Sequence, residues 1–195
     1  MVKRFACLIL AAGESKRFED CKLAADLKGK PVLAGILNTV SNLDSCDGFI
    51  CLGAHFDALK PLVSSEVKCI INQNWIQGMG SSIACGVTNI LADTRLDYEG
   101  IIIVLGDQYR IDSNDLNTLI KAFNDEKIIC SNYQGIKGVP TLFPKRFFSK
   151  LQQLDGTYGA RKLIKSLTSE CIFIDIPNAQ FDIDTTDDLE KAQLY

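Results

Sequence analysis

The sequence of 195 residues lacks the features that mark several large classes of protein. No apolar stretch approaches the roughly 18 residues that a membrane-spanning helix needs. Basic residues are not in excess, because 21 Lys and Arg stand against 24 Asp and Glu, which gives a net charge of −3. This balance argues against broad electrostatic binding to nucleic acid or to an anionic membrane, although it is compatible with a local cationic pocket. We therefore expect neither nucleic acid nor a membrane among its partners.

Histidine and tryptophan each occur once, and the eight cysteines show neither a CxxC pair nor the spacing of a metal site. Several cysteines lie inside apolar runs, where a thiol behaves as a small hydrophobic group. The start of the chain imitates a signal peptide, with Lys3 and Arg4 before an apolar run, but no small-residue cleavage site follows. These observations favour a reduced, cytoplasmic protein.

The composition is that of an ordinary globular protein. A hydrophobic content of 47% and a charged content of 23% exclude disordered and fibrous chains. No repeat, low-complexity tract or linker divides the sequence, so we expect a single domain over residues 1–195. Apolar runs of strand length alternate with segments of helical periodicity. This alternation predicts a doubly wound α/β fold, with a mostly parallel sheet and helices on both faces.

The positions of the elements follow from this alternation. Strands are expected at residues 5–10, 49–52, 67–71, 101–105, 127–130, 141–143 and 172–176. Helices are expected at residues 31–40, 81–91, 146–154 and 160–167. A further helix begins after Asp112 or Ser113 and runs to residue 123, and the last helix is capped by Thr185 or Thr186.

The loop after the first expected strand is a candidate phosphate site, because ligands of open α/β sheets lie beyond the carboxyl ends of the strands. The small residues 11–13 let the backbone approach a ligand closely, and a glycine turn can point successive N–H groups at phosphate oxygens. Lys16, Arg17 and Lys22 supply positive charge where a triphosphate needs it. The alternative is a loop with a solvated basic rim, because the segment is neither a Walker motif nor GxGxxG.

Two acidic segments are candidates for a cation site. Asp107 follows Gly106 at the mouth of the most apolar strand, where it can hold a divalent cation or simply form a turn. Asp182 and Asp184 are two residues apart, so on a strand they face the same side. A metal ion most simply offsets their repulsion, and we favour Asp184 over Asp182 as the ligand. The alternative is that one of these two acids belongs to the cap of the last helix.

Other landmarks are weaker. The glycine-rich segment 78–82 precedes a helix whose N-terminus could meet an anion, or it forms a flexible turn. Arg161, beside an expected helix start, could hold a substrate phosphate or form a surface ion pair. The only histidine, His55, is expected to be incidental, and Trp75 is expected to serve packing.

Six short motifs occur in an order that is specific as a set. They are Leu10-Ala11-Ala12-Gly13-x-Ser15-x-Arg17 with Lys22, Gly78-Met79-x-Ser81-Ser82, Gly106-Asp107-Gln108, Gly138-x-Pro140, Gly159-Ala160-Arg161 and Asp182-Ile183-Asp184-Thr185. Together they resemble the MobA-like nucleotidyltransferase family, and within it most closely the molybdenum cofactor cytidylyltransferases. The resemblance covers nearly the whole chain.

The resemblance implies a Rossmann-like fold of the nucleotide-diphospho-sugar transferase type, with CTP as substrate and Mg²⁺ as cofactor. The reaction it implies is transfer of CMP to the phosphate of molybdopterin with release of pyrophosphate. Such an acceptor phosphate is already anionic, so it can attack the α-phosphorus in line without a general base. A molybdoenzyme would be a further partner.

The same resemblance assigns roles to individual residues. The nucleotide-binding residues would be Leu10, Ala11, Ala12, Gly13, Arg17, Lys22, Asn72, Ser81 and Gly106. Lys22 and Asp107 would be the catalytic residues, with Lys22 on the triphosphate. Asp107 together with Asp184 (or Asp182) would bind magnesium. The acceptor-binding residues would be Gly138, Pro140 and Arg161.

Three residues depart from the family pattern. Tyr109 stands where the family has Pro, Thr157 stands where it has an acid, and Glu19 stands where it has Gly. The first two bear on the acceptor more than on the nucleotide, whereas Ala12 matches the cytidylyl form of the first motif. The open alternatives are another NTP, a sugar or alditol phosphate as acceptor, or a non-catalytic protein that handles the molybdenum cofactor.

Overall fold

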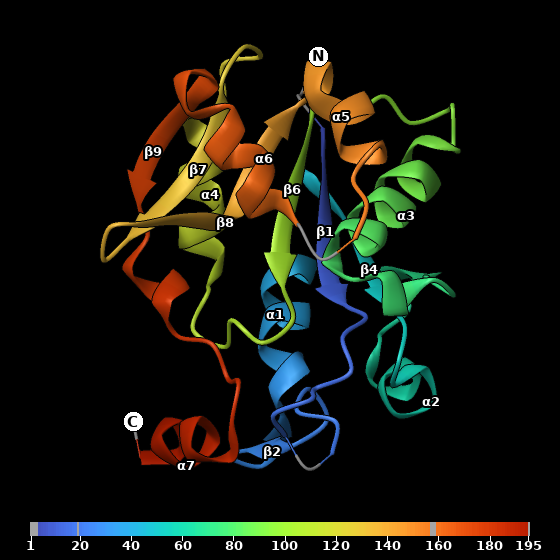
Figure 1. Cartoon of the computed structure of the whole chain (residues 1–195), viewed down its shortest axis with the longest axis vertical. Coiled ribbons are helices and arrows are strands. Elements are labelled where there is room, and N and C mark those ends of the chain that lie inside the picture. Colours follow the sequence, from blue (N-terminus) through green and yellow to red (C-terminus); the bar gives the residue numbers. More distant parts are fainter. Residues whose placement is uncertain (1–3, 19, 157–158, 195) are drawn as a thin grey trace.

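The computed structural model describes residues 4–18, 20–156 and 159–194, and it shows a sheet between two layers of helices (Figure 1). The seven strands of this sheet lie in the order β5–β4–β1–β6–β8–β7–β9. They are β1 (Phe5–Ala11), β4 (Cys46–Leu52), β5 (Val67–Ile71), β6 (Gly100–Leu105), β7 (Ile128–Tyr133), β8 (Ile136–Pro144) and β9 (Cys171–Asp175). Of these seven, β8 alone runs antiparallel to its neighbours. The predicted mostly parallel α/β sheet is therefore confirmed.

Strand β1 lies inside the sheet because every one of its positions is apolar and buried. Cys7, Leu8 and Ile9 have no exposed surface. Cys7 and Ile9 belong to the core on one face, while Leu8 belongs to the core on the other. A strand that is covered on both faces must be apolar throughout, which explains why this run shows no alternation of polar residues.

The helices divide between the two faces. One core is closed by α1 (Val32–Ser41) and α4 (Ser113–Lys121), and the other by α3 (Met79–Leu91), α5 (Phe148–Gln152) and α6 (Ala160–Ser166). The remaining elements are α2 (Phe56–Leu59), α7 (Thr186–Leu194), the ribbon of β2 (Asp26–Leu27) and β3 (Lys30–Pro31), and the 3₁₀ turns η1 (Lys60–Leu62), η2 (Trp75–Gln77), η3 (Lys145–Phe147), η4 (Thr168–Glu170) and η5 (Pro177–Gln180).

Local signals decide where the helices begin. Asp112 caps α4, because its carboxylate accepts hydrogen bonds from the N–H groups of Asn114 (2.8 Å) and Asp115 (3.0 Å). Thr185 caps α7, since its hydroxyl oxygen accepts from the N–H of Asp188 (3.2 Å). Helix α3 begins two residues earlier than expected, because Gly78, at a φ of 109°, turns the chain just before it. The helix expected at residues 146–154 is shorter, as η3 followed by α5.

Strands β7 and β8 form a hairpin that is longer than the two short strands expected there. Tyr133 pairs with Ile136, and the intervening Gln134 and Gly135 have positive φ values of 48° and 77°. Positive φ at both central residues is the geometry of a two-residue turn that joins antiparallel strands. This turn reverses β8 and places it between β6 and β7.

All eight cysteines are free thiols. Burial is the main reason that the pKa values of Cys46 and Cys51 are raised to about 12, so these thiols stay protonated near neutral pH. Across the described ranges, the helices are too short or too polar for any of them to cross a bilayer.

Candidate active site

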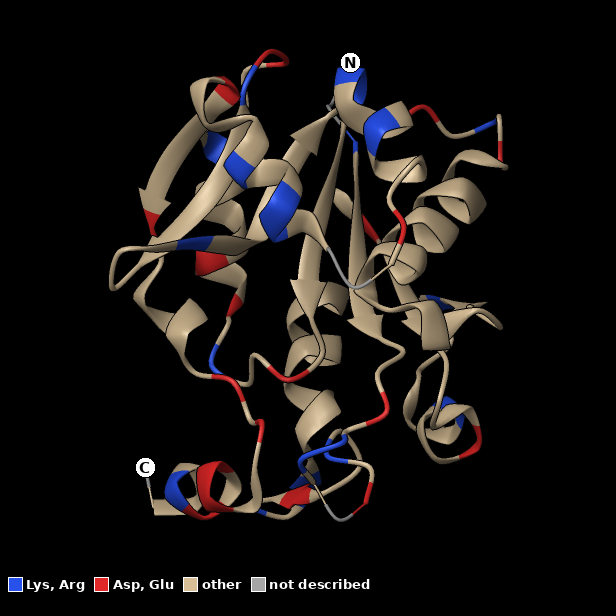
Figure 2. Ribbon diagram, in the orientation of Figure 1, with Lys and Arg blue, Asp and Glu red and all other residues tan. Residues whose placement is uncertain are grey.

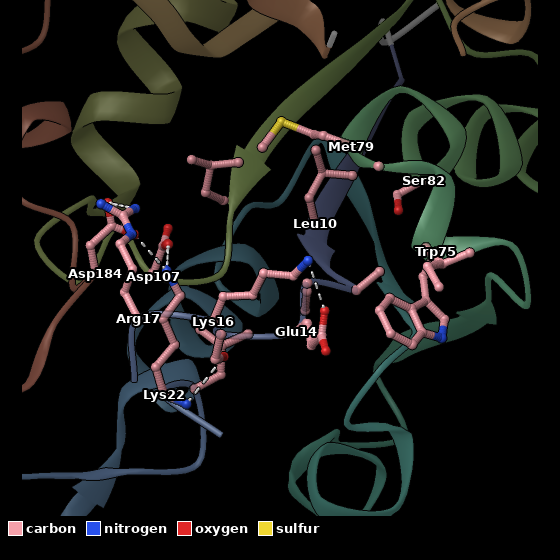
Figure 3. A pocket seen from close by; sticks show the side chains of 18 residues that line it. Leu10, Glu14, Lys16, Arg17, Lys22, Trp75, Met79, Ser82, Asp107 and Asp184 are labelled. Carbon is pink, nitrogen blue, oxygen red and sulfur yellow. Dashed lines mark hydrogen bonds and ion pairs between the residues drawn. The ribbon is translucent and has the colours of Figure 1, made fainter. Parts of the chain in front are cut away.

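A cavity of about 430 Å³ opens beyond the carboxyl ends of β1 and β6 (Figure 3). Residues 10–13, at the carboxyl end of β1 and just after it, line this cavity, and so do Asp107 and Asp184. The backbone there is tightly held: the N–H of Gly106 donates to the carbonyl of Leu10 (3.0 Å). The cavity thus lies where the rule for open α/β sheets places a ligand.

Charged side chains line one wall of this cavity. Lys22 Nζ donates to Asp107 Oδ2 (2.5 Å) and to Asp184 Oδ1 (2.9 Å). Arg17 Nη2 donates to the second oxygen of Asp184 (2.6 Å). The two carboxylates expected at one cation therefore meet at a shared ammonium group, although 77 residues separate them in the chain. Asp184, rather than Asp182, contacts Lys22 directly.

The ionisation of this wall follows from burial and from these pairings. Burial alone would lower the pKa of Lys22, but Asp107 and Asp184 outweigh it and the pKa is raised. Burial would raise the pKa of Asp184, yet Lys22 and Arg17 hold it below its usual value. The pKa of Asp182 is raised by partial burial and then by the charges of Asp107 and Asp184. Three carboxylates are therefore close enough to repel one another.

One oxygen atom in this wall is left without a partner. Asp107 Oδ1 is buried and accepts no hydrogen bond from any residue that the structure describes. A buried carboxylate oxygen in that state is costly, and such atoms call for an explanation in a native protein. A hard divalent cation such as Mg²⁺ or Mn²⁺ prefers this kind of oxygen. The donor set of Asp107 and Asp184 thus fits a divalent metal.

Protein ligands alone do not complete a metal shell here. The described residues include no group of three or more His, Cys, Asp or Glu side chains arranged around one point. Mg²⁺ is commonly held by one or two carboxylates, with water and substrate phosphates supplying the other ligands. This site is therefore suited to a metal that arrives with a phosphorylated substrate.

The opposite wall is apolar and comes from η2 and the start of α3. Trp75, Ile76 and Met79 line it, with 80% of Ile76 and 44% of Met79 exposed (Figure 3). The expectation that Trp75 serves only packing is incomplete, because the ring both packs on the core and lines the cavity. Gly53 lies behind it: a Cβ at Gly53 would come within 2.7 Å of the Ala12 carbonyl oxygen and of Trp75 Cβ.

Asn72 and Ser81, which the resemblance assigns to the nucleotide, do not line this cavity but lie behind its apolar wall, on a neighbouring pocket. Asn72 Nδ2 donates to the hydroxyl oxygens of Ser81 and Ser82 (3.0 Å each), and Asn72 Oδ1 accepts from Asn74 N–H (2.9 Å). The buried amide therefore ties the η2 loop to α3. Of Ser81 and Ser82, it is Ser82 that lines the cavity.

The residues assigned to the acceptor also lie outside the cavity. Gly138 is buried against Tyr133, whose hydroxyl oxygen would lie 3.0 Å from a Cβ at that glycine. Pro140 is buried, and its carbonyl accepts from Ser131 Oγ (2.6 Å). Arg161 is exposed at the start of α6. The structure therefore separates these three from the nucleotide residues, and Pro140 has a structural role in β8.

Tyr133 is a neighbour of this acceptor region that sequence analysis missed. Burial raises the pKa of its phenol, Asp182 raises it further, and Arg161 opposes them. Tyr133 is therefore close enough to Asp182 and Arg161 to sense the charge of each. Of the three departures from the family pattern, Tyr109 packs edge-on against Phe181 (6.5 Å between centroids), while Glu19 and Thr157 lie outside the described residues.

Comparison with known proteins agrees with this architecture. The family model described as the MobA-like NTP transferase domain matches residues 7–171, so the chain belongs to that family. It is 30% identical over 169 residues to the purine catabolism protein PucB of Bacillus subtilis (strain 168), covering 82% of this chain and 80% of PucB.

Solved structures of the same shape were also found. The homologue of Mycobacterium tuberculosis Rv0371c from Mycobacterium sp. strain JC1 is 25% identical, with a TM-score of 0.80, over 100% of this chain and 97% of its own. Rv0371c in complex with manganese is 20% identical, with a TM-score of 0.72, over 98% and 99% of the two chains. The fold is the nucleotide-diphospho-sugar transferase type, and the protein is a nucleotidyltransferase.

Proposed function

We propose that the protein transfers CMP from CTP to the phosphate of molybdopterin, with release of pyrophosphate and with Mg²⁺ as cofactor. The observation that carries this proposal is the division of one cavity into a charged wall and an apolar wall. A nucleoside triphosphate has the same division, because its phosphates are anionic and its base is flat and apolar on both faces. We further propose that it acts in the cytoplasm, where free thiols persist.

The charged wall would hold the triphosphate. The ammonium group of Lys22 donates hydrogen bonds to two carboxylates, and its side chain is only 16% exposed in the cavity. Arg17 and Lys16 extend the positive charge toward solvent. The backbone of the loop at residues 10–13 would approach the phosphates, since Gly13 has open space around its Cα.

The apolar wall would hold the base. Trp75 and Met79 offer an aromatic face and a polarisable thioether, and both stack well on a heteroaromatic ring. Ser82 would give the base a polar contact at the rear of the pocket. Cytosine rather than guanine is supported by Ala12, which matches the cytidylyl form of the family motif.

Asp107 and Asp184 would hold the divalent metal. Asp107 Oδ1 has no partner in the described chain and would be a ligand for the metal, and the Lys22 ammonium beside both carboxylates would bind the phosphates. When bound, the metal neutralises charge that develops on the transferring phosphoryl group. Mg²⁺ is the proposed ion, and the manganese complex of Rv0371c supports a divalent metal at this fold.

The chemistry itself requires positioning more than activation. An oxygen of the acceptor phosphate would attack the α-phosphorus, a new P–O–P bond would form, and the bond to the β-phosphate would break so that pyrophosphate leaves. No general base is needed for an anionic nucleophile. The cysteines stay protonated, and His55 bonds through Nε2 to the Glu14 carbonyl (3.1 Å), so direct transfer is supported over a covalent enzyme intermediate.

A sugar or alditol phosphate is the second candidate acceptor. It is favoured by the departures at Tyr109 and Thr157, which fall on the acceptor side. A third candidate is a protein that binds nucleotide or cofactor without catalysis and delivers it to a molybdoenzyme. The retained set of Lys22, Asp107 and Asp184 favours catalysis.

The proposal is tested by measuring Mg²⁺-dependent release of pyrophosphate. Each of four NTPs is combined with molybdopterin and with each member of a panel of phosphosugars. We expect release with CTP and molybdopterin, and far slower release from the Asp107→Ala variant. Release with a phosphosugar alone would support the second candidate. Trp75 is the only tryptophan, so its fluorescence reports nucleotide binding separately. CTP binding without pyrophosphate release would identify the non-catalytic protein.

A further inference from the structure

Gln108 follows Asp107 directly, yet it does not line the cavity. Its side chain is 2% exposed and makes three hydrogen bonds to backbone. Oε1 accepts from the N–H of Leu105 (3.3 Å), and Nε2 donates to the carbonyls of Val139 (3.0 Å) and Ala179 (3.0 Å). Both amide hydrogens and the carbonyl oxygen are therefore in use.

These three bonds join segments that are distant in the sequence. Leu105 ends β6, Val139 lies in β8 between two residues assigned to the acceptor, and Ala179 lies in η5. Ala179 comes just before the acidic segment at residues 182–184. A backbone hydrogen bond also connects Asp107 to this acidic segment: the N–H of Ile183 donates to the carbonyl of Asp107 (3.3 Å).

The geometry assigns Gln108 a positioning role: we propose that its amide sets the separation of the Asp107 and Asp184 carboxylates and fixes β8 relative to them. This inference rests on the proposed function of the site. Without the amide, the Ile183 N–H would make the one hydrogen bond left between residues 177–184 and residues 105–108 of the described chain, while Asn178 Nδ2 would still donate to Asp115 Oδ2 (2.9 Å). Since the buried carbonyl of Ala179 and the partly buried carbonyl of Val139 would also lose this donor, the two segments would move apart.

The role predicts which measurements change. Gln108 does not line the cavity that would hold the nucleotide, so the affinity for nucleotide should be preserved. Metal affinity and the rate of transfer depend on the carboxylate separation, so both should fall. Residues that orient metal ligands typically contribute about 10- to 100-fold to affinity or activity.

Two neutral variants test this without changing the charge of the site. Gln108→Met keeps the length and removes all three hydrogen bonds, while Gln108→Asn keeps an amide that is too short to reach both carbonyls. We expect Mn²⁺ alone, titrated by electron paramagnetic resonance, to bind about tenfold more weakly to Gln108→Met. We expect kcat for pyrophosphate release to fall about 10- to 100-fold with KM for CTP within about threefold. Gln108→Asn should lie between Gln108→Met and the wild type.

Two controls separate positioning from general loss of stability. Tyr98→Phe removes a buried hydrogen bond to Asp47 at the amino end of the sheet, and Gln152→Met removes an exposed amide on α5. Tyr98→Phe should lower the thermal midpoint while leaving Mn²⁺ affinity and kcat unchanged, and Gln152→Met should change none of them. The inference is overturned if folded Gln108→Asn matches wild type in Mn²⁺ affinity and kcat, or if Tyr98→Phe weakens Mn²⁺ binding equally. Gln108→Asn decides alone if Gln108→Met does not fold.

The failure of the proposed function has a different signature. Wild-type protein would then bind Mn²⁺ but release no pyrophosphate with any NTP and acceptor. The Mn²⁺ titrations of the Gln108 variants would still decide whether the amide positions the carboxylates.

Discussion

Acidic residues at the two ends of the sheet have opposite surroundings. At the amino end, Asp47 accepts hydrogen bonds from Arg4 Nε (2.7 Å), Arg4 Nη2 (2.5 Å) and Tyr98 Oη (2.5 Å), so both carboxylate oxygens have partners. At the carboxyl end, Asp107 has one oxygen on Lys22 and a second, buried oxygen without a partner in the described chain. Acids also gather in the loops beyond the carboxyl end of β6, below that strand in Figure 2.

The pKa values express the same contrast. The hydrogen bond from Arg4 is the main reason that the pKa of Asp47 is lowered, with Tyr98 adding to it. Asp182 shows the reverse, because burial and its acidic neighbours raise its pKa. A carboxylate with complete partners stabilises the fold, whereas one with incomplete partners is prepared for a ligand. Substitutions at the two ends of the sheet test this contrast: those at the carboxyl end should change activity, and those at the amino end should change stability.

Asp107→Ala should have the largest effect. We expect pyrophosphate release to fall about 10²- to 10³-fold, because the metal that would neutralise charge on the reacting phosphates loses a ligand. The thermal midpoint should stay close to wild type, since removing a buried oxygen without a partner removes a cost. A folded Asp107→Ala protein with near-normal release would contradict the assignment. Circular dichroism on the same sample provides the folding control.

Lys22→Ala should have the next largest effect. Loss of a charge-assisted contact to the triphosphate should raise KM for CTP about tenfold or more. Lys30→Ala, an exposed lysine on β3, is the matched control and should leave CTP kinetics unchanged. Steady-state kinetics with varied CTP measure both. Unaltered CTP kinetics in Lys22→Ala would exclude its role on the phosphates.

Asp47→Asn should show the opposite pattern at the amino end. We expect the free energy of unfolding to fall by about 1 kcal/mol, because hydrogen bonds to a charged acceptor are weakened. Both kcat and KM should match wild type. Urea unfolding at pH 7 alongside the pyrophosphate assay tests this, and a loss of activity without a loss of stability would break the comparison.

The Asp47 contribution should also depend on pH in a defined direction. Its pKa in the folded protein is below the unfolded value of about 3.9, so the stability it adds is present above that pH. It is lost as the pH falls through the folded pKa. The difference in unfolding free energy between wild type and Asp47→Asn should therefore shrink between pH 5 and pH 2. A difference that is constant over this range would show that the cause is not ionisation.

Gly138→Ala should have the smallest effect. This substitution tests whether the acceptor binds near Gly138, outside the cavity. The new Cβ would lie 3.0 Å from the Tyr133 hydroxyl oxygen, so the phenol must shift by a few tenths of an ångström. We expect KM for the acceptor to rise a few-fold while KM for CTP is unchanged. Adding Tyr133→Phe should relieve the contact and restore the acceptor KM. An effect on CTP alone would argue against an acceptor region there.

Sequence reasoning worked where the signal was local. The apolar runs of β1 and β6 predicted buried parallel strands, and the rule that ligands lie beyond strand ends then selected Gly13, Asp107 and Asp184. Asp182 and Asp184 do not lie on a strand, so their two-residue spacing did not place them on one side, and of the two it is Asp184 that accepts a hydrogen bond from Lys22. The meeting of Asp107 with Asp184 at Lys22 follows from these local features combined with sheet topology.

Sequence reasoning failed where structure depends on distant partners. Strand β8 reverses direction because Gln134 and Gly135 form a two-residue turn with positive φ at both positions. The glycine is a local signal for such a turn, but the antiparallel pairing that results involves distant strands. Asn72 and Ser81 support the apolar wall from behind through a hydrogen bond to each other. No sequence pattern distinguishes this supporting role from direct contact with a nucleotide. Tyr133 gave no signal, because an aromatic residue at a strand end has no distinctive spacing.

Gly53 leads to a final consequence for the shape of the cavity. Ala12, at the carboxyl end of β1, and Trp75, on the apolar wall, both approach this glycine so closely that a methyl group would collide with each. The width of the cavity between Ala12 and Trp75 therefore depends on a glycine that does not itself line the cavity. A larger residue at position 53 would force these two residues apart.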